Sequence, residues 1–504
     1  MFGHGGALVR QGRMGPGEDG GTARWRRRPL LRAAAGATVL GAGWVAAACA
    51  TSTGGAASST TPAAAAPQPV GNVIKLYFNT NWQGAAYNKT AMNLVQSYVD
   101  ANFNTKHKGL WAYVTPSNGQ GQAQAVIADS IAGAPGTPDI VEDCCSDLAT
   151  YEAGNWLLPL NEYLKQDNIS ISLWNRGHID ALSLNGMHYA LPSYDGPMVV
   201  YYRQDTLDQL GLPYPSPHWT YAEATTLWER CVSTKKGALR SGCAMEWLPS
   251  PQYLFKGWGG SLIDSSHTKC LIDSPECIAA GSWFYQGIAD HALTYRNEIG
   301  GLTPAKPSNV FAMCGGWDLL PAAEQLGTSY KWDILPVPTW PKGFATFVNI
   351  DFYGMNRGSK HPHAAWELMK FIAVDPGYTR FQMRVTLIQP ALLSLWSEWE
   401  TTVKQVAPPL RNKALHYYKD AALSGRTYPH EFFLHSAPQA DAIIGSVGSQ
   451  IAARKVSVTE GFRLAAQRVN ALELASANEA KASVGVAKAF PTKGPNIAVV
   501  TPGL

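Results

Sequence analysis

The amino-acid sequence predicts an α/β protein that is divided into two or more lobes. From residue 73 onward, short apolar segments of strand character alternate with amphipathic segments of helix character, which is typical of a parallel sheet covered by helices. The chain has 504 residues, more than one hydrophobic core usually accommodates. Hydrophobic residues make up 46% of the chain and charged residues 15%, as expected of a globular protein.

The alternation begins with two strands separated by a helix. We predict strands at VIKLYFN (73–79) and GLWAYVTP (109–116), with a helix at TAMNLVQSYVDANF (90–103) between them. The next segment, 121–145, is interpreted as a helix, a turn rich in Gly and Pro, and a third strand that ends in PDIVEDCC. A further strand is predicted in the apolar run that follows the turn at 192–197.

Helix boundaries in the rest of the chain are marked by capping residues. Asp205 is predicted to cap a short helix that ends at Gly211, because glycine readily adopts the left-handed conformation of a C-cap. Two capping boxes and one Ser-Pro-Glu start predict three further helix N-termini. These begin at Thr220, Ser274 and Ser457.

The first 48 residues have the features of an export signal. An Arg-rich segment (24–32) precedes sixteen uncharged residues (33–48), fewer than the roughly 20 apolar residues of a membrane span. RRPLLR resembles a twin-arginine signal, and AAAC resembles a bacterial lipoprotein box in which Cys49 receives the lipid. The alternative is a plain cleaved signal in which the cysteine is incidental. The translation start is either Met1 or Met14. Residues 49–71 are rich in Ala, Ser, Thr and Pro and are predicted to form a flexible tether.

The positive charge of the chain is concentrated in this leader. The formal net charge is +4, and the leader contains seven Arg and two acidic residues. Removing these seven positive and two negative charges leaves about −1. The exported part therefore has no excess of basic residues that would indicate nucleic-acid binding.

Seven cysteines follow Cys49, and export makes disulfides possible. We predict two disulfides that would each close a short local loop, Cys231–Cys243 and Cys270–Cys277. Three cysteines are then left over, so at least one free thiol is expected. Of these, the adjacent Cys144 and Cys145 are expected to include a buried thiol, with a strained disulfide between neighbours as the alternative, and Cys314 is unassigned.

Motif searches exclude the common nucleotide-binding and hydrolase chemistries. The chain contains no GxxxxGK[ST] phosphate loop, no GxSxG nucleophile motif and no Rossmann glycine pattern after a strand. His430 and His435 of HEFFLH are separated by about 140° on a helix, whereas a shared metal requires i, i+4 spacing. We therefore expect no metal site and no cofactor.

A series of motifs along the chain resembles one protein family. The longest is GMHYALPSYDGPMVVYYRQDTLDQLGLPYPSPHWTYAEA (186–224), which reads G-x-x-Y-x-L-P, a turn, an apolar strand with Y-Y-R-x-D, and a capped helix. It is followed in order by WGGSLIDSS, DSPECIAAGSWFYQGIADHALT, VFAMCGGWDLLPAA, WDILPVPTWPKG, FYGMNRGSKHPHAAWELMKFIA and TLIQPALLSL. Over most of residues 73–475 the chain is thereby similar to the family 1 extracellular solute-binding proteins of bacterial ABC importers, the sugar-binding group that includes maltose-binding protein. His218 and Gly316 depart from the usual Thr and Pro of the pattern.

The resemblance implies a two-lobed periplasmic-binding-protein fold of type II, with lobes that are discontinuous in sequence, a hinge, and a central ligand cleft. It implies an N-terminal lobe of 73–193 plus 348–412 and a C-terminal lobe of 197–345 plus 413–480. Residues 483–504 are expected to be a loosely held tail. The hinge would allow the lobes to close on a ligand.

The resemblance also implies which residues bind the ligand. Aromatic rings cover the C–H faces of sugars, and carboxylates bind sugar hydroxyl groups. The ligand-binding residues expected from the motifs are Trp82, Asp143, Tyr194, Asp195, Trp247, Trp258, Trp317, Asp351 and Tyr428. Packing beneath a Gly-Gly turn is the alternative for Trp258, and backbone hydrogen bonding at the hinge is the alternative for Asp195 and Asp351.

Together these features predict an exported, lipid-anchored receptor that captures a sugar or oligosaccharide and delivers it to an ABC permease served by a separate cytoplasmic ATPase. It is expected to act as a monomer and to catalyse no reaction. One alternative is a different ligand, such as glycerol phosphate, a polyol or a peptide; a phosphate would require Arg or Lys, and only Arg203 and Lys256 are nearby. The other is a secreted carbohydrate-active enzyme, which needs a carboxylate pair about 5–10 Å apart that no motif marks.

Overall fold

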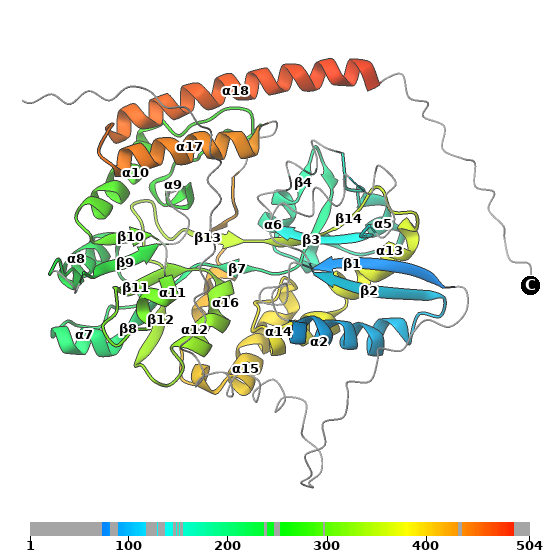
Figure 1. Ribbon diagram of the computed structural model, residues 1–504, viewed down its shortest axis with the longest axis horizontal. Coiled ribbons are helices and arrows are strands. Elements are labelled where there is room, and N and C mark those ends of the chain that lie inside the picture. Colours follow the sequence, from blue (N-terminus) through cyan, green and yellow to red (C-terminus); the bar gives the residue numbers. More distant parts are fainter. Residues whose placement is uncertain are drawn as a thin grey trace, which may run out of the picture. The chain divides into compact units, whose positions relative to one another are not determined.

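The computed structural model describes residues 73–80, 89–116, 129, 137–144, 148, 151, 155–235, 239–245, 252–295, 298–431 and 436–487. Within these residues the strands form two five-stranded sheets, one three-stranded sheet and one two-stranded sheet (Figure 1). The leader, the tether, Cys49, Trp82, Cys145 and Trp247 lie outside the described residues, as does the side chain of Cys144.

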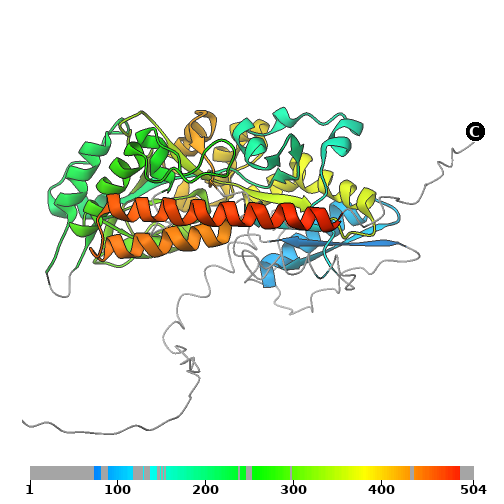
Figure 2. The same cartoon turned by 90° about the horizontal axis from the view of Figure 1, so that it is seen from above.

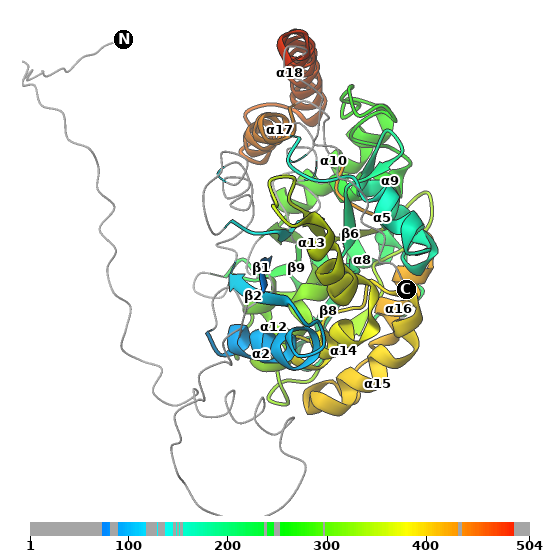
Figure 3. The same ribbon diagram turned by 90° about the vertical axis from the view of Figure 1, so that its right-hand side faces the viewer.

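The first five-stranded sheet has the order β2-β1-β3-β14-β6. Its strands are β1 (Ile74–Thr80), β2 (Leu110–Pro116), β3 (Ile140–Cys144), β6 (Ala190–Pro192) and β14 (Asp351–Met355). β1 is parallel to β2 and β3, whereas β14 is antiparallel to β3 and β6. Helix α2 (Lys89–Val99) packs on β2, and α13 (Pro362–Met369) packs on β1 and β14 (Figure 3). The predicted early strands and the helix between them are confirmed.

The second five-stranded sheet has the order β10-β9-β11-β8-β12. Its strands are β8 (Val199–Arg203), β9 (Ser241–Met245), β10 (Leu293–Tyr295), β11 (Asn309–Cys314) and β12 (Trp332–Leu335). β9, β10 and β11 are parallel to one another, and β8 is antiparallel to β11 and β12. Helices α8 (Tyr221–Cys231), α10 (Pro275–Ala289) and α11 (Glu298–Leu302) pack against this sheet.

A three-stranded sheet connects the two larger ones along the chain. Its order is β15-β13-β7, with β7 (Gly196–Pro197), β13 (Thr346–Asn349) and β15 (Thr427–Tyr428). β7 lies between β6 and β8 in the sequence, and β13 lies between β12 and β14. The chain therefore passes from one large sheet to the other through β7 and returns through β13, which makes this small sheet the hinge sheet.

The remaining elements are helical, apart from a two-stranded hairpin. The hairpin strands are β4 (Ser183–Leu184) and β5 (Met187–His188). The other helices are α5 (Asn161–Gln166), α6 (Arg176–Ala181), α7 (Gln204–Leu210), α9 (Gln252–Trp258), α12 (Leu319–Gln325), α14 (Pro376–Val385), α15 (Trp396–Val406), α16 (His416–Leu423), α17 (Ala437–Ala452) and α18 (Val458–Ala487). Short π or 3₁₀ segments are η1 (Asp100–Asn104), η3 (Ile171–Leu173), η4 (Gly316–Asp318), η5 (Lys370–Val374), η6 (Leu393–Leu395) and η7 (Pro408–Leu410).

The helix boundaries confirm most of the predicted capping and correct two details. The Thr220 capping box, the Ser274 cap and the reciprocal Ser457–Glu460 hydrogen bonds are all present. Asp205 is not the cap of α7, because the helix begins at Gln204 and Asp205 lies in its first turn. The Asp205 carboxylate instead accepts hydrogen bonds from the Arg203 guanidinium at 2.7 and 3.0 Å. The last helix lies beside α17 (Figures 1 and 2) and continues to residue 487, into the predicted loose tail.

Aromatic side chains join the second sheet to helices that follow the first. Tyr201 of β8 and Trp332 of β12 belong to the same buried cluster as Trp396 and Trp399 of α15 and Tyr418 of α16. The hydroxyl groups of Tyr201 and Tyr418 are hydrogen-bonded to each other. Residues after β14 therefore pack against both large sheets.

The predicted disulfides are not formed, which corrects the sequence interpretation. Cys231, Cys270 and Cys277 are free thiols, so neither the Cys231–Cys243 pair nor the Cys270–Cys277 pair exists. All four side chains belong to the core of the second sheet, where each acts as a small apolar group.

We expect these thiols to be unreactive in the folded protein. Burial raises the pKa of Cys231, Cys270 and Cys277 to about 12 in each case, and the reactive species is the thiolate. A thiol-reactive chromogenic disulfide should therefore modify them only after unfolding, and dithiothreitol should leave the melting temperature unchanged. A melting temperature that falls when dithiothreitol is added would show that disulfides do form.

Candidate functional site

The carboxyl ends of parallel strands in both large sheets meet the hinge sheet. In the first sheet, β3 ends at Cys144, which pairs with Asp351 at the start of β14, directly after the hinge strand β13. In the second sheet, β11 ends at Cys314, which pairs with Val199 at the start of β8, directly after β7. Ligands of α/β sheets bind outside the carboxyl ends of the strands. The residues at these two edges and on the hinge strands therefore form the candidate site.

Buried acids occupy the edge of the first sheet. Asp143 is fully buried, and its carboxylate accepts a hydrogen bond from the Tyr151 hydroxyl at 2.5 Å. The neighbouring Glu142 accepts a hydrogen bond from the Thr80 hydroxyl at the end of β1. Asp351 accepts a hydrogen bond from the Asn349 side chain at 2.9 Å. The three donors, two hydroxyl groups and one side-chain amide, are neutral. Carboxylates are also the groups that bind sugar hydroxyl groups.

Tyr194 forms the centre of the turn that enters the hinge. Its ring is buried, and its hydroxyl accepts a hydrogen bond from the Asn349 side chain at 3.1 Å. The ring lies directly over Gly196, where a Cβ atom would come within 2.3 Å of it. Glycine at 196 is therefore required for this close approach. Asn349 links Tyr194 to Asp351, so the residues before β7 and after β13 share one hydrogen-bond network.

Asp195, the next residue, is fully buried beside His178 of α6. The His178 Nε2 and Asp195 Oδ1 atoms are 3.5 Å apart, and neither side chain has a hydrogen-bond partner among the described residues. Burial raises the pKa of Asp195 well above its usual value and lowers the pKa of His178 to about 3. At neutral pH burial thus favours a protonated acid and a neutral imidazole in this pair.

Trp317 lies at the edge of the second sheet, in the 3₁₀ turn that follows β11. Its ring folds over Gly315, where a Cβ atom would be 2.0 Å from the ring, and it remains partly exposed. It is packed against the core of the second sheet on one side. A partly exposed aromatic ring on a firm base is suited to stacking against a flat apolar surface of a ligand.

The other predicted ligand residues lie in different surroundings. Trp258 ends α9 within an aromatic cluster, with ring centroids 5.3 Å from Trp283 and 5.4 Å from Trp340. Tyr428 is half-buried on β15, with the Lys256 ammonium 5.8 Å from its ring centroid. The structure thus brings Asp143, Tyr194, Asp195 and Asp351 together at the hinge edge of the first sheet, and Trp317 at the edge of the second.

Sequence reasoning missed several residues of this region. They are Tyr151, His178 and Asn349, which contact Asp143, Asp195 and Tyr194 respectively, and Gln389, whose side-chain amide donates to the Gly316 carbonyl oxygen at 3.2 Å. Gln389 lies in the motif TLIQPALLSL, so the motif pointed to its neighbourhood. His178 and Tyr151 carried no sequence signal, because nothing in the local pattern shows which distant strand their side chains meet.

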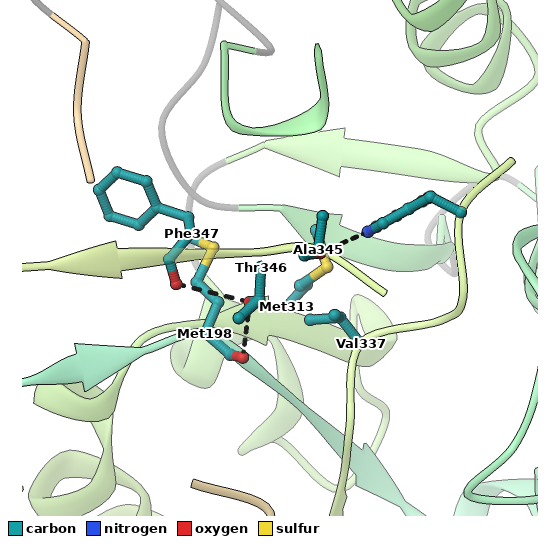
Figure 4. A pocket seen from close by; sticks show the side chains of 7 residues that line it. Met198, Met313, Val337, Ala345, Thr346 and Phe347 are labelled. Atoms are coloured by element: carbon teal, nitrogen blue, oxygen red, sulfur yellow. Dashed lines mark hydrogen bonds between the residues drawn. The ribbon is translucent and has the colours of Figure 1, made fainter. Parts of the chain in front are cut away.

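A small apolar void lies beneath the hinge strand β13 (Figure 4). It is lined by Met198, Met313, Val337, Trp340, Ala345, Thr346 and Phe347, and it leaves no room for a water molecule. The Thr346 hydroxyl donates a hydrogen bond to the Met198 carbonyl oxygen at 2.9 Å, which joins the two crossing segments. The void is a feature of packing under the hinge and is too small to hold a ligand.

The described residues contain no group of three or more His, Cys, Asp and Glu side chains that could hold a metal ion. None of the helices in that part of the chain is both long enough and apolar enough to cross a membrane.

Comparison with known proteins identifies both a family and a fold. Residues 85–378, more than half of the chain, match the family described as bacterial extracellular solute-binding protein. The sugar-binding protein MalE from Xanthomonas citri is 17% identical, with a TM-score of 0.64, and the match covers 83% of this chain and 100% of that chain. At this identity the likeness concerns the fold.

Two further solved structures match to a similar degree. A cyclic alpha-maltosyl-1,6-maltose binding protein from Arthrobacter globiformis is 16% identical over 80% of this chain and 99% of that chain, with a TM-score of 0.63. An ABC substrate-binding protein from Listeria monocytogenes in complex with cycloalternan is 16% identical, with a TM-score of 0.62. The match covers 79% of this chain and 98% of that chain. The predicted two-lobed α/β fold is therefore confirmed.

Proposed function

Because the chain belongs to the bacterial extracellular solute-binding proteins, we propose that it captures a sugar or oligosaccharide between its two lobes and delivers it to the permease of an ABC importer. The observation that carries the proposal is the pairing of a partly exposed tryptophan with a group of buried acids. Trp317 stands at the carboxyl edge of one sheet, and Asp143 and Asp351 stand at that of the other. Ring and carboxylates together match the apolar face and the hydroxyl groups of a sugar.

Solved relatives support a sugar ligand for this fold. One is in complex with cycloalternan, one is a cyclic alpha-maltosyl-1,6-maltose binding protein, and one is bound to maltose. We extend the sugar class to this chain because the Trp317 ring and the acids at the sheet edges have the chemistry that sugar binding requires.

Neither of the two cations considered for a phosphate ligand is available to it in the structure. The Arg203 guanidinium is almost fully buried, pairs with Asp205 at 2.7 Å and donates to the Leu302 carbonyl oxygen. Lys256 pairs with Glu431 at 2.7 Å. Both cations already have partners, whereas a phosphate needs cations that are available to it. A neutral ligand, sugar or polyol, therefore suits this region better than glycerol phosphate.

The remaining parts of the proposal concern the place of action and the organisation of the chain. The leader and Cys49 support export and lipid anchoring outside the cytoplasm, with residues 49–71 as the tether. We propose N-terminal and C-terminal lobes close to 73–193 plus 348–412 and 197–345 plus 413–480, acting as a monomer that binds without catalysis. The hinge sheet supports a closing motion of these lobes.

A carbohydrate panel tests the proposal. A ligand at 100 times its Kd adds about 2.7 kcal/mol to stability and raises the melting temperature. We expect such a shift with at least one neutral mono- or oligosaccharide, and recovery of that sugar uncleaved. A shift only with phosphate esters or peptides would overturn the sugar assignment, and recovery of cleaved sugar would indicate an enzyme.

Trp317→Ala should weaken binding of the sugar found in that panel. Loss of a stacking ring typically removes one to two kcal/mol or more, so we expect Kd to rise roughly 10-fold or more by isothermal titration. Tyr214→Ala, which removes an exposed ring on the outer side of the second sheet, is the control and should leave Kd unchanged. Equal affinity of the Trp317→Ala variant and the unmodified protein would remove Trp317 from the site.

A further inference from the structure

The segment between α14 and η6 has a fixed and strained backbone. Leu387 adopts a φ of 61°, in the left-handed region that costs a leucine conformational energy. The indole N–H of Trp399 donates to the carbonyl oxygens of Leu387 at 3.3 Å and Ile388 at 2.9 Å, which holds the segment in this shape. A strained conformation that is held by its surroundings often marks a functional position.

The next residue, Gln389, contacts the hinge turn and the second sheet's edge at the same time. Its main-chain carbonyl oxygen accepts a hydrogen bond from the Asp195 N–H at 3.4 Å. Its side-chain amide donates to the Gly316 carbonyl oxygen at 3.2 Å. Pro390, beside it, forms a bridge with Tyr194. One fully buried residue therefore joins Asp195 to the turn that carries Trp317.

The two glycines before Trp317 permit this contact. A Cβ atom at Gly316 would be 2.1 Å from Oε1 and 2.5 Å from Cδ of Gln389, too close for any real contact. Gln389 is fully buried, so its amide group cannot move out into solvent to avoid such a Cβ atom. A Cβ atom at Gly315 would meet the Trp317 ring instead. The turn is thus enclosed by Trp317 on one side and Gln389 on the other.

We propose that Gln389 is a positioning residue for ligand binding, which couples the Trp317 turn to the hinge so that ligand stacking and lobe closure favour each other. The inference rests on the proposed function for its ligand. A ligand that stacks on Trp317 restrains the adjoining Gly316 carbonyl group, which is the acceptor for Gln389. The same residue holds the Asp195 amide, so the restraint reaches the hinge. Such a coupling between two sites is reciprocal.

The first test needs no ligand. Gly316→Ala, Gln389→Ala and the double variant are compared with the unmodified protein by equilibrium urea unfolding, with Thr386→Val as the control in the same segment. We expect Gly316→Ala to lower the transition midpoint clearly, and to lose at least half of that effect when Gln389 is already alanine, because the clash is relieved. Additive effects of the two substitutions would overturn the proposal.

The second test follows ligand release, with maltotriose as the probe and stopped-flow tryptophan fluorescence as the signal. Gln389→Ala should raise the dissociation rate about 10-fold and leave the association rate nearly unchanged, because the contact acts after docking. Gln389→Glu cannot donate to the Gly316 carbonyl oxygen when ionised but can when protonated. Its dissociation should therefore slow as the pH falls from 8 to 5, relative to the unmodified protein at the same pH.

The outcomes separate this inference from the proposed function. Unchanged dissociation in Gln389→Ala, or no pH-dependent recovery in Gln389→Glu, would overturn the positioning role while sugar binding stands. If neither maltotriose nor any panel sugar binds the unmodified protein, the proposed ligand is wrong. In that case the unfolding comparison alone decides whether Gln389 holds the turn to the hinge.

Discussion

Replacing Asp195 with asparagine is expected to increase the free energy of unfolding at pH 7. Burial raises the pKa of Asp195 well above its usual 3.8 in the folded state. The folded protein therefore retains a proton that the unfolded chain releases above pH 4, so the contribution of this group is greatest at low pH and is lost as the pH rises. Asparagine has a similar shape and does not titrate, so its advantage should grow by up to about 1.4 kcal/mol for each pH unit between the unfolded and folded pKa values of Asp195.

Urea unfolding at pH 4, 5.5, 7 and 8.5 measures this effect. The difference in unfolding free energy between Asp195→Asn and the unmodified protein should be smallest at pH 4 and should increase toward pH 8.5 in favour of the variant. Asp290→Asn, at an exposed helix end, is the control and should show no such trend. A difference that is the same at every pH would show that Asp195 is not held in its protonated form.

Buried, neutral His178 is expected to make the protein lose stability in acid. Burial lowers its pKa from 6.5 to about 3, so the unfolded chain binds a proton that the folded protein does not bind between these values. The stabilising contribution is therefore complete above pH 6.5 and declines as the pH falls toward 3. The loss is about 1.4 kcal/mol for each pH unit below 6.5, or about 2 kcal/mol at pH 5.

His178→Phe tests this prediction, because phenylalanine fills similar space without titrating. The variant should lose less stability than the unmodified protein between pH 7 and pH 5, by about 2 kcal/mol, whatever its stability at pH 7. His218→Phe, at an exposed position, is the matched control. Because Nε2 of His178 and Oδ1 of Asp195 are 3.5 Å apart, we also expect the acid profile to change in Asp195→Asn. Parallel pH profiles for His178→Phe and the unmodified protein would contradict the neutral, buried histidine.

Local patterns predicted the elements that carry the site. The alternation of strands and helices, the capping box at Thr220 and the C-cap at Gly211 depend on neighbouring residues, and the structure confirms them. The predicted disulfides were wrong because they depend on tertiary packing and not on neighbouring residues. Short spacing showed that Cys231 and Cys243 could close a loop, but the direction of each thiol depends on the packing of α8 and β9 into the core.

The sequence by itself determined the order of strands and helices, the family resemblance, and the positions of Tyr194, Asp195 and Trp317 in turns after strands, since these follow from residue type and spacing. Only the tertiary structure decided that His178 meets Asp195, that Asn349 joins Tyr194 to Asp351, and that Gln389 reaches Gly316. These partners are up to 155 residues apart in the sequence. Their contacts depend on the register of the hinge strands and on the packing of the edges, which no local pattern of residues encodes.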